Sequence, residues 1–123
     1  MITKRITFLD YNGIARTENF DFHMNRVEAL DFALSIDGDL TEFVRKCVEE
    51  DNKTALIGMV KQIVEKSYGK KSEDGRRFMK SEEISRSFIE TEAYPALMSE
   101  LISNSEEAAQ FINGALSEVK PVE

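Results

Sequence analysis

The fold is decided by residues 2–24, which read ITKRITFLDYNGIARTENFDFHM. Apolar and polar residues alternate on both sides of the central DYNG, and an alternation of period two predicts a β-strand with one buried face. The sequence therefore predicts two strands joined as a hairpin. The apolar positions that define the two faces are Ile2, Ile6 and Phe8 in the first strand, and Ile14, Phe20, Phe22 and Met24 in the second.

The turn between these strands can be built in two ways. A two-residue turn at Asn12-Gly13 would point the two apolar faces in opposite directions, because it pairs even-numbered positions with odd-numbered ones. A three-residue loop of residues 11–13, with Gly13 in the left-handed conformation, pairs Asp10 with Ile14 and brings both faces to one side. We expect the second register. Because an isolated hairpin is marginal in water, helices or another sheet edge must cover its aromatic face.

Helical patterns follow the hairpin, which makes the expected fold class α+β. Asn25 and Glu28 have the spacing of a capping box and predict the start of a helix. Asp37-Gly38-Asp39 should end this helix, and Thr41 should cap the next one, which carries Phe43, Val44, Cys47 and Val48 on one side.

The best-formed helix is expected from about Asn52 to Ser67, with Gly69 as its left-handed cap. Residues 68–77 should then form a loop of about ten residues. Gly58 interrupts the helical pattern at a cost of about 1 kcal/mol relative to alanine. A close approach of another backbone, in a tight helix crossing, is the expected reason for this glycine.

Further helical segments are expected to begin at Ser81 and near Ser105, and another is expected to carry Pro95 in its first turn. Because proline disfavours helix at the preceding residue, a break or kink should occur near residues 93–94. The prediction is thus an N-terminal β-hairpin followed by a bundle of about five α-helices. The last helix should carry Ala108, Phe111, Ile112, Ala115 and Leu116.

Composition fits one domain of residues 1–123, whose last residues, 118–123, should fray. The chain has 41% hydrophobic and 32% charged residues, which is typical of a globular protein. Cys47 has no second cysteine to pair with and points to a reducing compartment. No stretch of 18 apolar residues could cross a membrane, and the N-terminus lacks the apolar run of a signal peptide. We therefore expect a cytosolic protein.

Charge is distributed unevenly along the chain. The formal net charge is −7, yet residues 66–80 hold six Lys and Arg against two acids, whereas residues 81–123 hold two against nine. An acidic chain repels polyanions as a whole, so a general nucleic-acid binder is not expected. A basic partner surface or an intramolecular charge match agrees better with this distribution.

No motif predicts catalysis, a metal or a cofactor. His23 stands alone, and Cys47 has no activating histidine nearby, so a structural role is expected for both. Asp37-Gly38-Asp39 lacks the other ligands of a calcium loop, and Gly69-Lys70-Lys71-Ser72 lacks the upstream glycine of a phosphate-binding loop. We expect no enzyme and neither a metal nor a cofactor.

The basic stretch allows two interpretations. It is either a solvated loop that complements acidic helices, or a surface that binds a partner. In the second case Lys70, Lys71, Arg76 and Arg77 would hold acidic groups of another protein, with the arginines better suited to paired hydrogen bonds. Asp74-Gly75 would form the turn that presents these side chains.

The stretch resembles a known family. The segments concerned are Tyr68-Gly69, Ser72-Glu73-Asp74-Gly75-Arg76-Arg77-Phe78, Lys80-Ser81, Phe88 and Glu92-Ala93-Tyr94, together with Asp10-Tyr11-Asn12-Gly13 and the segment from Ala108 to Gly114. In these segments the chain resembles the small tail assembly chaperones of long-tailed bacteriophages. The resemblance implies a family motif, expected to be mostly structural, that consists of Tyr68, Gly69, Asp74, Gly75, Phe78, Phe88, Glu92 and Tyr94.

The resemblance also implies a function. Such a protein binds the tape measure protein, keeps it soluble in the cytoplasm of the bacterial host, and is absent from the mature virion. The tail tube protein is a second candidate partner, homo-oligomerisation stays open, and neither nucleic acid nor membrane is expected. Two alternatives remain: a structural tail component, such as a connector or terminator-like subunit, and a small regulatory protein-binding module.

Overall fold

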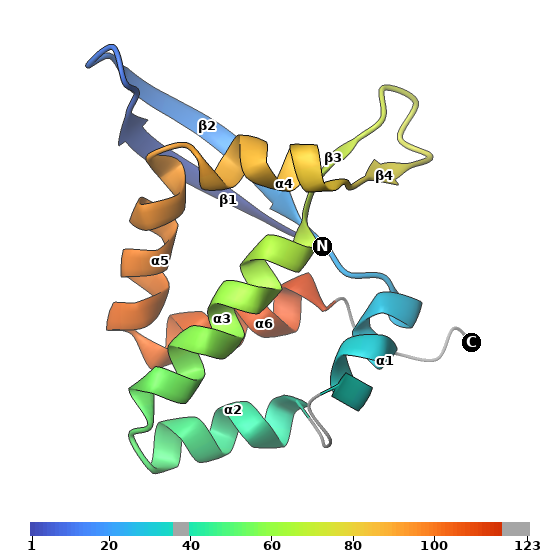
Figure 1. The fold of residues 1–123 in the computed structure, drawn as a ribbon, viewed down its shortest axis with the longest axis vertical. Helices are drawn as coiled ribbons and strands as arrows, with labels where there is room; N and C mark the ends of the chain where they lie inside the picture. Colours follow the sequence, from blue (N-terminus) through green and yellow to red (C-terminus); the bar gives the residue numbers. More distant parts are fainter. Residues whose placement is uncertain (36–39, 117–123) are drawn as a thin grey trace.

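The computed structural model describes residues 1–35 and 40–116. Four antiparallel strands form one sheet in the order β1-β2-β3-β4, and six helices accompany it in these residues (Figure 1). The α+β prediction is therefore confirmed. The elements are β1 (Ile2–Leu9), β2 (Ala15–Phe22), α1 (Arg26–Ser35), α2 (Leu40–Glu49), α3 (Lys53–Ser67), β3 (Tyr68–Lys71), β4 (Phe78–Met79), α4 (Glu82–Ile89), α5 (Ala93–Ser103) and α6 (Ser105–Ala115).

The first hairpin has the predicted three-residue loop. The Asp10 amide donates to the Ile14 carbonyl at 2.9 Å, and Gly13 has a φ of 80°. One Asp10 carboxylate oxygen also accepts the amides of Asn12 and Ile14, at 2.8 and 2.9 Å. Because the tip projects past the helices (Figure 1), Ile14 is exposed although it follows the apolar alternation of its strand.

The core lies between one face of the sheet and the helices. Ile6 is buried on β1 while its neighbours Arg5 and Thr7 are exposed, so helices cover one sheet face only. Aromatic rings fill the centre, where Phe22 lies 5.5 Å from Phe88 and 5.1 Å from Phe111 between ring centroids. The aromatic face of the hairpin is thus covered, and burial of such large rings is a main source of stability.

The structure corrects the predicted loop at residues 68–77. After α3 the chain continues at once as β3, where Tyr68 pairs with Phe22 and Gly69 with Asp21. A turn then leads into β4, so this segment is a second hairpin that extends the sheet. Pairing with β2 gives the strand a hydrogen-bonding edge and buries the Tyr68 ring, both of which a solvated loop would lose.

Gly69 is consequently not the left-handed helix cap that we expected. The glycines with positive φ in the described part are Gly13 and Gly75. A Cβ atom on Gly69 would lie 2.5 Å from Cε2 of Phe78 and 2.8 Å from the Met79 carbonyl oxygen. The residue is glycine because β4 passes too close for a side chain.

Most of the predicted helix starts are confirmed by side-chain caps. Asn25 and Glu28 form the reciprocal capping box, with bonds of 2.8 and 2.9 Å. Asn52 caps α3, Ser81 caps α4 and Asn104 caps α6. The break falls at residues 90–92, slightly before the expected residues 93–94, which already belong to α5; proline is the third residue of α5, in its first turn as predicted.

Two helix predictions are wrong. The second helix begins at Leu40, so Thr41 lies in its first turn and is not its cap. Gly58 has no atom within 4 Å of a built Cβ position, so a tight crossing does not explain this glycine. The predicted break at Asp37–Asp39 and the predicted frayed tail at residues 118–123 lie outside the described residues.

Candidate functional site

The candidate site is the second hairpin, residues 68–79, which we call the basic hairpin. Its turn is held by Asp74, whose carboxylate accepts the Ser72 hydroxyl at 2.7 Å and the Arg76 amide at 3.0 Å. These two hydrogen bonds keep the pKa of Asp74 below its ordinary value. Gly75 completes the turn with a φ of 76°, a conformation that glycine adopts without strain.

Ser72 and Arg77 close the base of this turn. The Ser72 amide donates to the Arg77 carbonyl at 2.8 Å, and the Arg77 amide donates to the Ser72 hydroxyl at 3.0 Å. The Gly75 amide also donates to the Ser72 carbonyl at 2.9 Å. Arg76 and Arg77 contribute only backbone groups to these bonds, so their side chains are not used to build the turn.

Four cations project from the basic hairpin. Lys70, Lys71, Arg76 and Arg77 are all exposed. Across residues 1–35 and 40–116, the ion pairs connect other side chains and include none of these four. The acidic residues of the neighbouring helices therefore do not neutralise this surface by direct contact, and its charge is available to another molecule.

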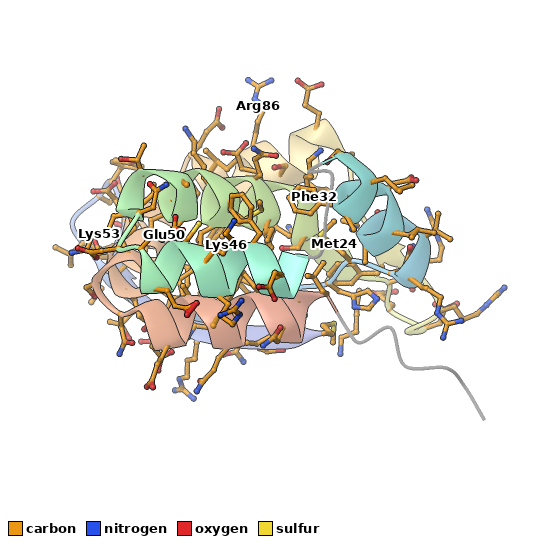
Figure 2. The ribbon with its side chains drawn as sticks, turned by 90° about the horizontal axis from the view of Figure 1, so that it is seen from below. Met24, Phe32, Lys46, Glu50, Lys53 and Arg86 are labelled. Carbon is orange, nitrogen blue, oxygen red and sulfur yellow. The ribbon has the colours of Figure 1, made fainter. Side chains whose placement is uncertain are left out.

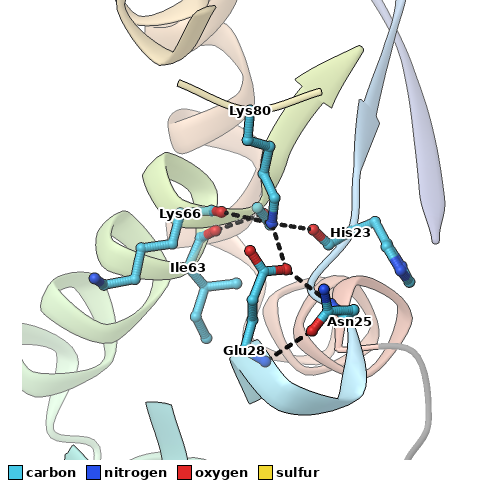
Figure 3. A network of polar contacts seen from close by, with 7 residues as sticks. His23, Asn25, Glu28, Ile63, Lys66 and Lys80 are labelled. Atoms are coloured by element: carbon cyan, nitrogen blue, oxygen red, sulfur yellow. Dashed lines mark hydrogen bonds and ion pairs between the residues drawn. The ribbon is translucent and has the colours of Figure 1, made fainter. Parts of the chain in front are cut away.

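Lys80 follows the basic hairpin but has a different role. Its ammonium nitrogen donates to Glu28 at 2.7 Å, to the His23 carbonyl at 2.9 Å and to the Lys66 carbonyl at 3.2 Å (Figure 3). Burial raises the pKa of Glu28, but the bonds from Lys80 and the Asn25 amide outweigh this effect and lower it overall. Sequence analysis missed this network because no local pattern relates Lys80 to α1.

The residues of the family motif lie mostly in packing positions. The Tyr68 ring stacks on Phe88 with centroids 4.9 Å apart, and Tyr94 meets Phe88 edge-on at 5.8 Å. The Tyr94 hydroxyl donates to Glu65 at 3.4 Å. These rings connect β3, α3, α4 and α5, so they determine where the basic hairpin sits relative to the helices.

Glu92 and Phe78 connect more distant parts of the chain. The Tyr11 hydroxyl, at the tip of the first hairpin, donates to Glu92 at 3.3 Å just before α5. The Phe78 ring packs edge-on against His23, with centroids 5.7 Å apart. With Gly69 beneath it, Phe78 holds β4 against the end of β2.

A family model described as phage tail assembly chaperone matches residues 1–118. The chain belongs to the phage tail assembly chaperone family. The match includes both hairpins and every helix of the described chain, so it extends well beyond the motif around the basic hairpin. Comparisons with curated proteins and with solved structures gave no significant match.

The two isolated reactive side chains of this tail assembly chaperone are at least partly buried. Burial, and to a smaller extent Glu50, raises the pKa of the Cys47 thiol, which disfavours the nucleophilic thiolate. Burial also lowers the pKa of His23, whose Nδ1 atom has no hydrogen-bond partner in the described chain.

In residues 1–35 and 40–116, no group of three or more His, Cys, Asp or Glu side chains is arranged so that it could hold a metal ion. The helices of the same residues include none with the length and apolar character of a membrane span.

Proposed function

We propose that this tail assembly chaperone binds the tape measure protein of its phage and keeps it dispersed until the tail tube assembles around it. The observation that carries this proposal is the set of four exposed cations on the basic hairpin, which form no ion pair within the described residues of a chain of net charge −7. A hydrogen-bonded turn presents Arg76 and Arg77, whose planar guanidinium groups bind carboxylates through paired hydrogen bonds.

Reversible binding is sufficient for this function, and no bond needs to be made or broken. A chaperone that binds exposed apolar helices lowers their free concentration and thereby their aggregation. The negative charge on the rest of the chaperone repels other complexes and keeps them apart. We place this activity in the cytoplasm of the bacterial host, without a cofactor or a catalytic step, and with release before the virion is complete.

Co-expression with the tape measure gene of the same phage tests the proposal. The tape measure protein should be recovered in the soluble fraction, bound to the chaperone, when both are produced, and in the pellet when it is produced alone. An equally soluble tape measure protein in both cultures would contradict the proposal. The tail tube protein, the second candidate partner, should be tested in a parallel culture.

Mass spectrometry separates the chaperone function from the structural alternative. A chaperone should be abundant in infected lysate and absent from purified particles. Stoichiometric amounts in the particles would instead identify a connector or terminator-like component. Capture of a host factor in place of the tape measure protein would identify a regulatory module.

A further inference from the structure

Helix α1 carries an apolar stripe that nothing in the described chain covers. Val27, Leu30 and Leu34 are 67%, 59% and 71% exposed. Their spacing of three and four residues places them on one face of the helix. Single exposed apolar residues are common on proteins, but an aligned set on one helix is typical of an interaction surface.

The opposite side of α1 already fixes the helix to the molecule. Ala29 and Phe32 are buried, and Figure 2 shows the Phe32 side chain between α1 and α3. Glu28 adds the bond to Lys80 shown in Figure 3. The stripe therefore has no part in anchoring α1, and within residues 1–35 and 40–116 it is left exposed.

An acidic groove adjoins the stripe. It has a volume of about 720 Å³ and is lined by residues of α1, α3 and the start of α4. Its charged lining residues are Glu28, Asp31, Glu65, Lys66, Lys80 and Glu82. Because Lys80 is bonded to Glu28, three carboxylates remain against one lysine. Asp31 lies four residues after Val27 and three before Leu34, so it borders both the stripe and the groove.

We propose that this stripe and groove dock an amphipathic helix that carries Lys or Arg beside its apolar face. The apolar face would cover Val27, Leu30 and Leu34, and the basic flank would lie against Asp31 and the groove. A second copy of this chain is disfavoured, because each copy has a net charge of −7 and an acidic groove at the contact. The identification of the client as a tape measure segment rests on the proposed function.

A double substitution with a matched control tests the docking site. Leu30→Ser with Leu34→Ser removes apolar surface from α1, whereas Leu9→Ser with Ile14→Ser removes side chains that are 60% and 58% exposed at the hairpin tip. The probes are the co-expressed full-length tape measure protein and overlapping synthetic peptides that cover its sequence. We expect the α1 variant to lose about tenfold or more in affinity and the tip variant to stay within about twofold.

Asp31→Lys tests the charge of the groove. This variant should bind the basic peptides more weakly than wild type at low salt, and the difference should shrink as salt is added. Circular dichroism melting of each variant establishes that the fold is intact before affinities are compared. Undiminished binding by the folded α1 variant, or an equal loss by the tip variant, would overturn the docking site.

The outcomes also distinguish the two proposals. If wild type retains the tape measure protein and the α1 variant retains as much, only the docking site is wrong. If wild type retains no tape measure protein, the proposed function is wrong, and so is the assignment of the docked helix to a tape measure segment. Sedimentation measurements that show a wild-type dimer and a monomeric α1 variant would identify a second copy as the occupant and overturn the assignment to a basic helix.

Discussion

The ammonium nitrogen of Lys80 lies 2.7 Å from a carboxylate oxygen of Glu28, which is 52 residues earlier in the chain. The same nitrogen donates to the carbonyl of Lys66 in the last turn of α3. Carbonyls in that turn lack partners within the helix, and a cation is favourable at a helix C-terminus. One side chain therefore joins the start of α4 to the start of α1 and the end of α3.

Lys80→Met should lower the free energy of unfolding by about 1–2 kcal/mol, because it leaves Glu28 and two carbonyl oxygens with poorer partners. The Lys80 side chain is 18% exposed and that of Glu28 is 39% exposed, so solvent screens the pair and the loss should stay below that of a fully buried ion pair. Urea denaturation measures the change. Lys70→Met, at an exposed position, is the control and should change stability by less than about 0.5 kcal/mol.

Gly69→Ala should lower stability by about 1–3 kcal/mol, because the methyl group would clash with Phe78 and with the Met79 carbonyl. The ring could turn, but the carbonyl is backbone and moves only if β4 shifts. Gly58→Ala is a matched substitution in open helical surface and should raise stability by about 0.5–1 kcal/mol. The melting temperatures of the two variants should therefore shift in opposite directions from that of wild type. Shifts of the same sign would contradict the close packing of β4 on Gly69.

Phe88→Ala should destabilise the fold by about 3–5 kcal/mol. Phe88 is buried and meets four other aromatic rings, at centroid distances of 4.9 to 5.8 Å. Phe88→Leu keeps most of the volume and should cost clearly less. Chemical denaturation of both variants gives the comparison, and an unchanged midpoint for Phe88→Ala would mean that this ring does not support the core in solution.

The stability of the protein should decrease as the pH falls below about 6.5, the ordinary pKa of histidine. In the folded protein burial, then the N-terminal ammonium and Lys80, lowers the pKa of His23, while Glu28 acts in the opposite direction. Between the lowered value and 6.5 the unfolded chain binds more protons than the folded one, so acid favours unfolding. Carboxylates with lowered pKa values, such as Glu28, reduce the stability further only when the pH falls below about 4.5, the ordinary pKa of glutamate.

His23→Gln isolates the histidine contribution, since glutamine does not titrate. Urea unfolding of this variant between pH 7 and pH 5 should show a flatter pH dependence than that of wild type. Equal slopes for the two proteins would exclude His23 as the source of the acid sensitivity.

The sequence predicted those features that depend on residues close together in the chain. The register of the first hairpin follows from Gly13 and the apolar alternation, and the capping box of Asn25 and Glu28 depends on a spacing of three. The second hairpin was missed because β3 forms by pairing with the distant β2, and β4 in turn pairs with β3. A Tyr-Gly pair at the end of a helix is compatible both with a glycine cap and with the start of a strand, so the local sequence does not distinguish the two.

The sequence predicted the four cations of the basic hairpin as a set. It did not predict that Lys80 is used in internal hydrogen bonds whereas these four are exposed. Lys80 belongs to the same basic stretch, and only the fold brings it to Glu28 and to the end of α3. The exposed stripe on α1 was also missed. Its leucines and valine have the spacing of core positions, and whether such residues are covered depends on the packing of the whole helix.

Arg76→Glu together with Arg77→Glu should weaken binding of the tape measure protein without unfolding the chaperone. The turn is built from the Asp74 carboxylate, the Ser72 hydroxyl and backbone amides, so reversal of the two side-chain charges leaves its hydrogen bonds in place. Co-purification from cells that produce both proteins measures retention, and wild-type binding should itself weaken as salt is raised. Lys53→Glu with Lys61→Glu makes the same change in net charge at exposed positions of α3 and is the control. Equal retention by both variants would show that the basic hairpin does not contact the partner, whereas a loss confined to the arginine variant would show that position, and not net charge, determines binding.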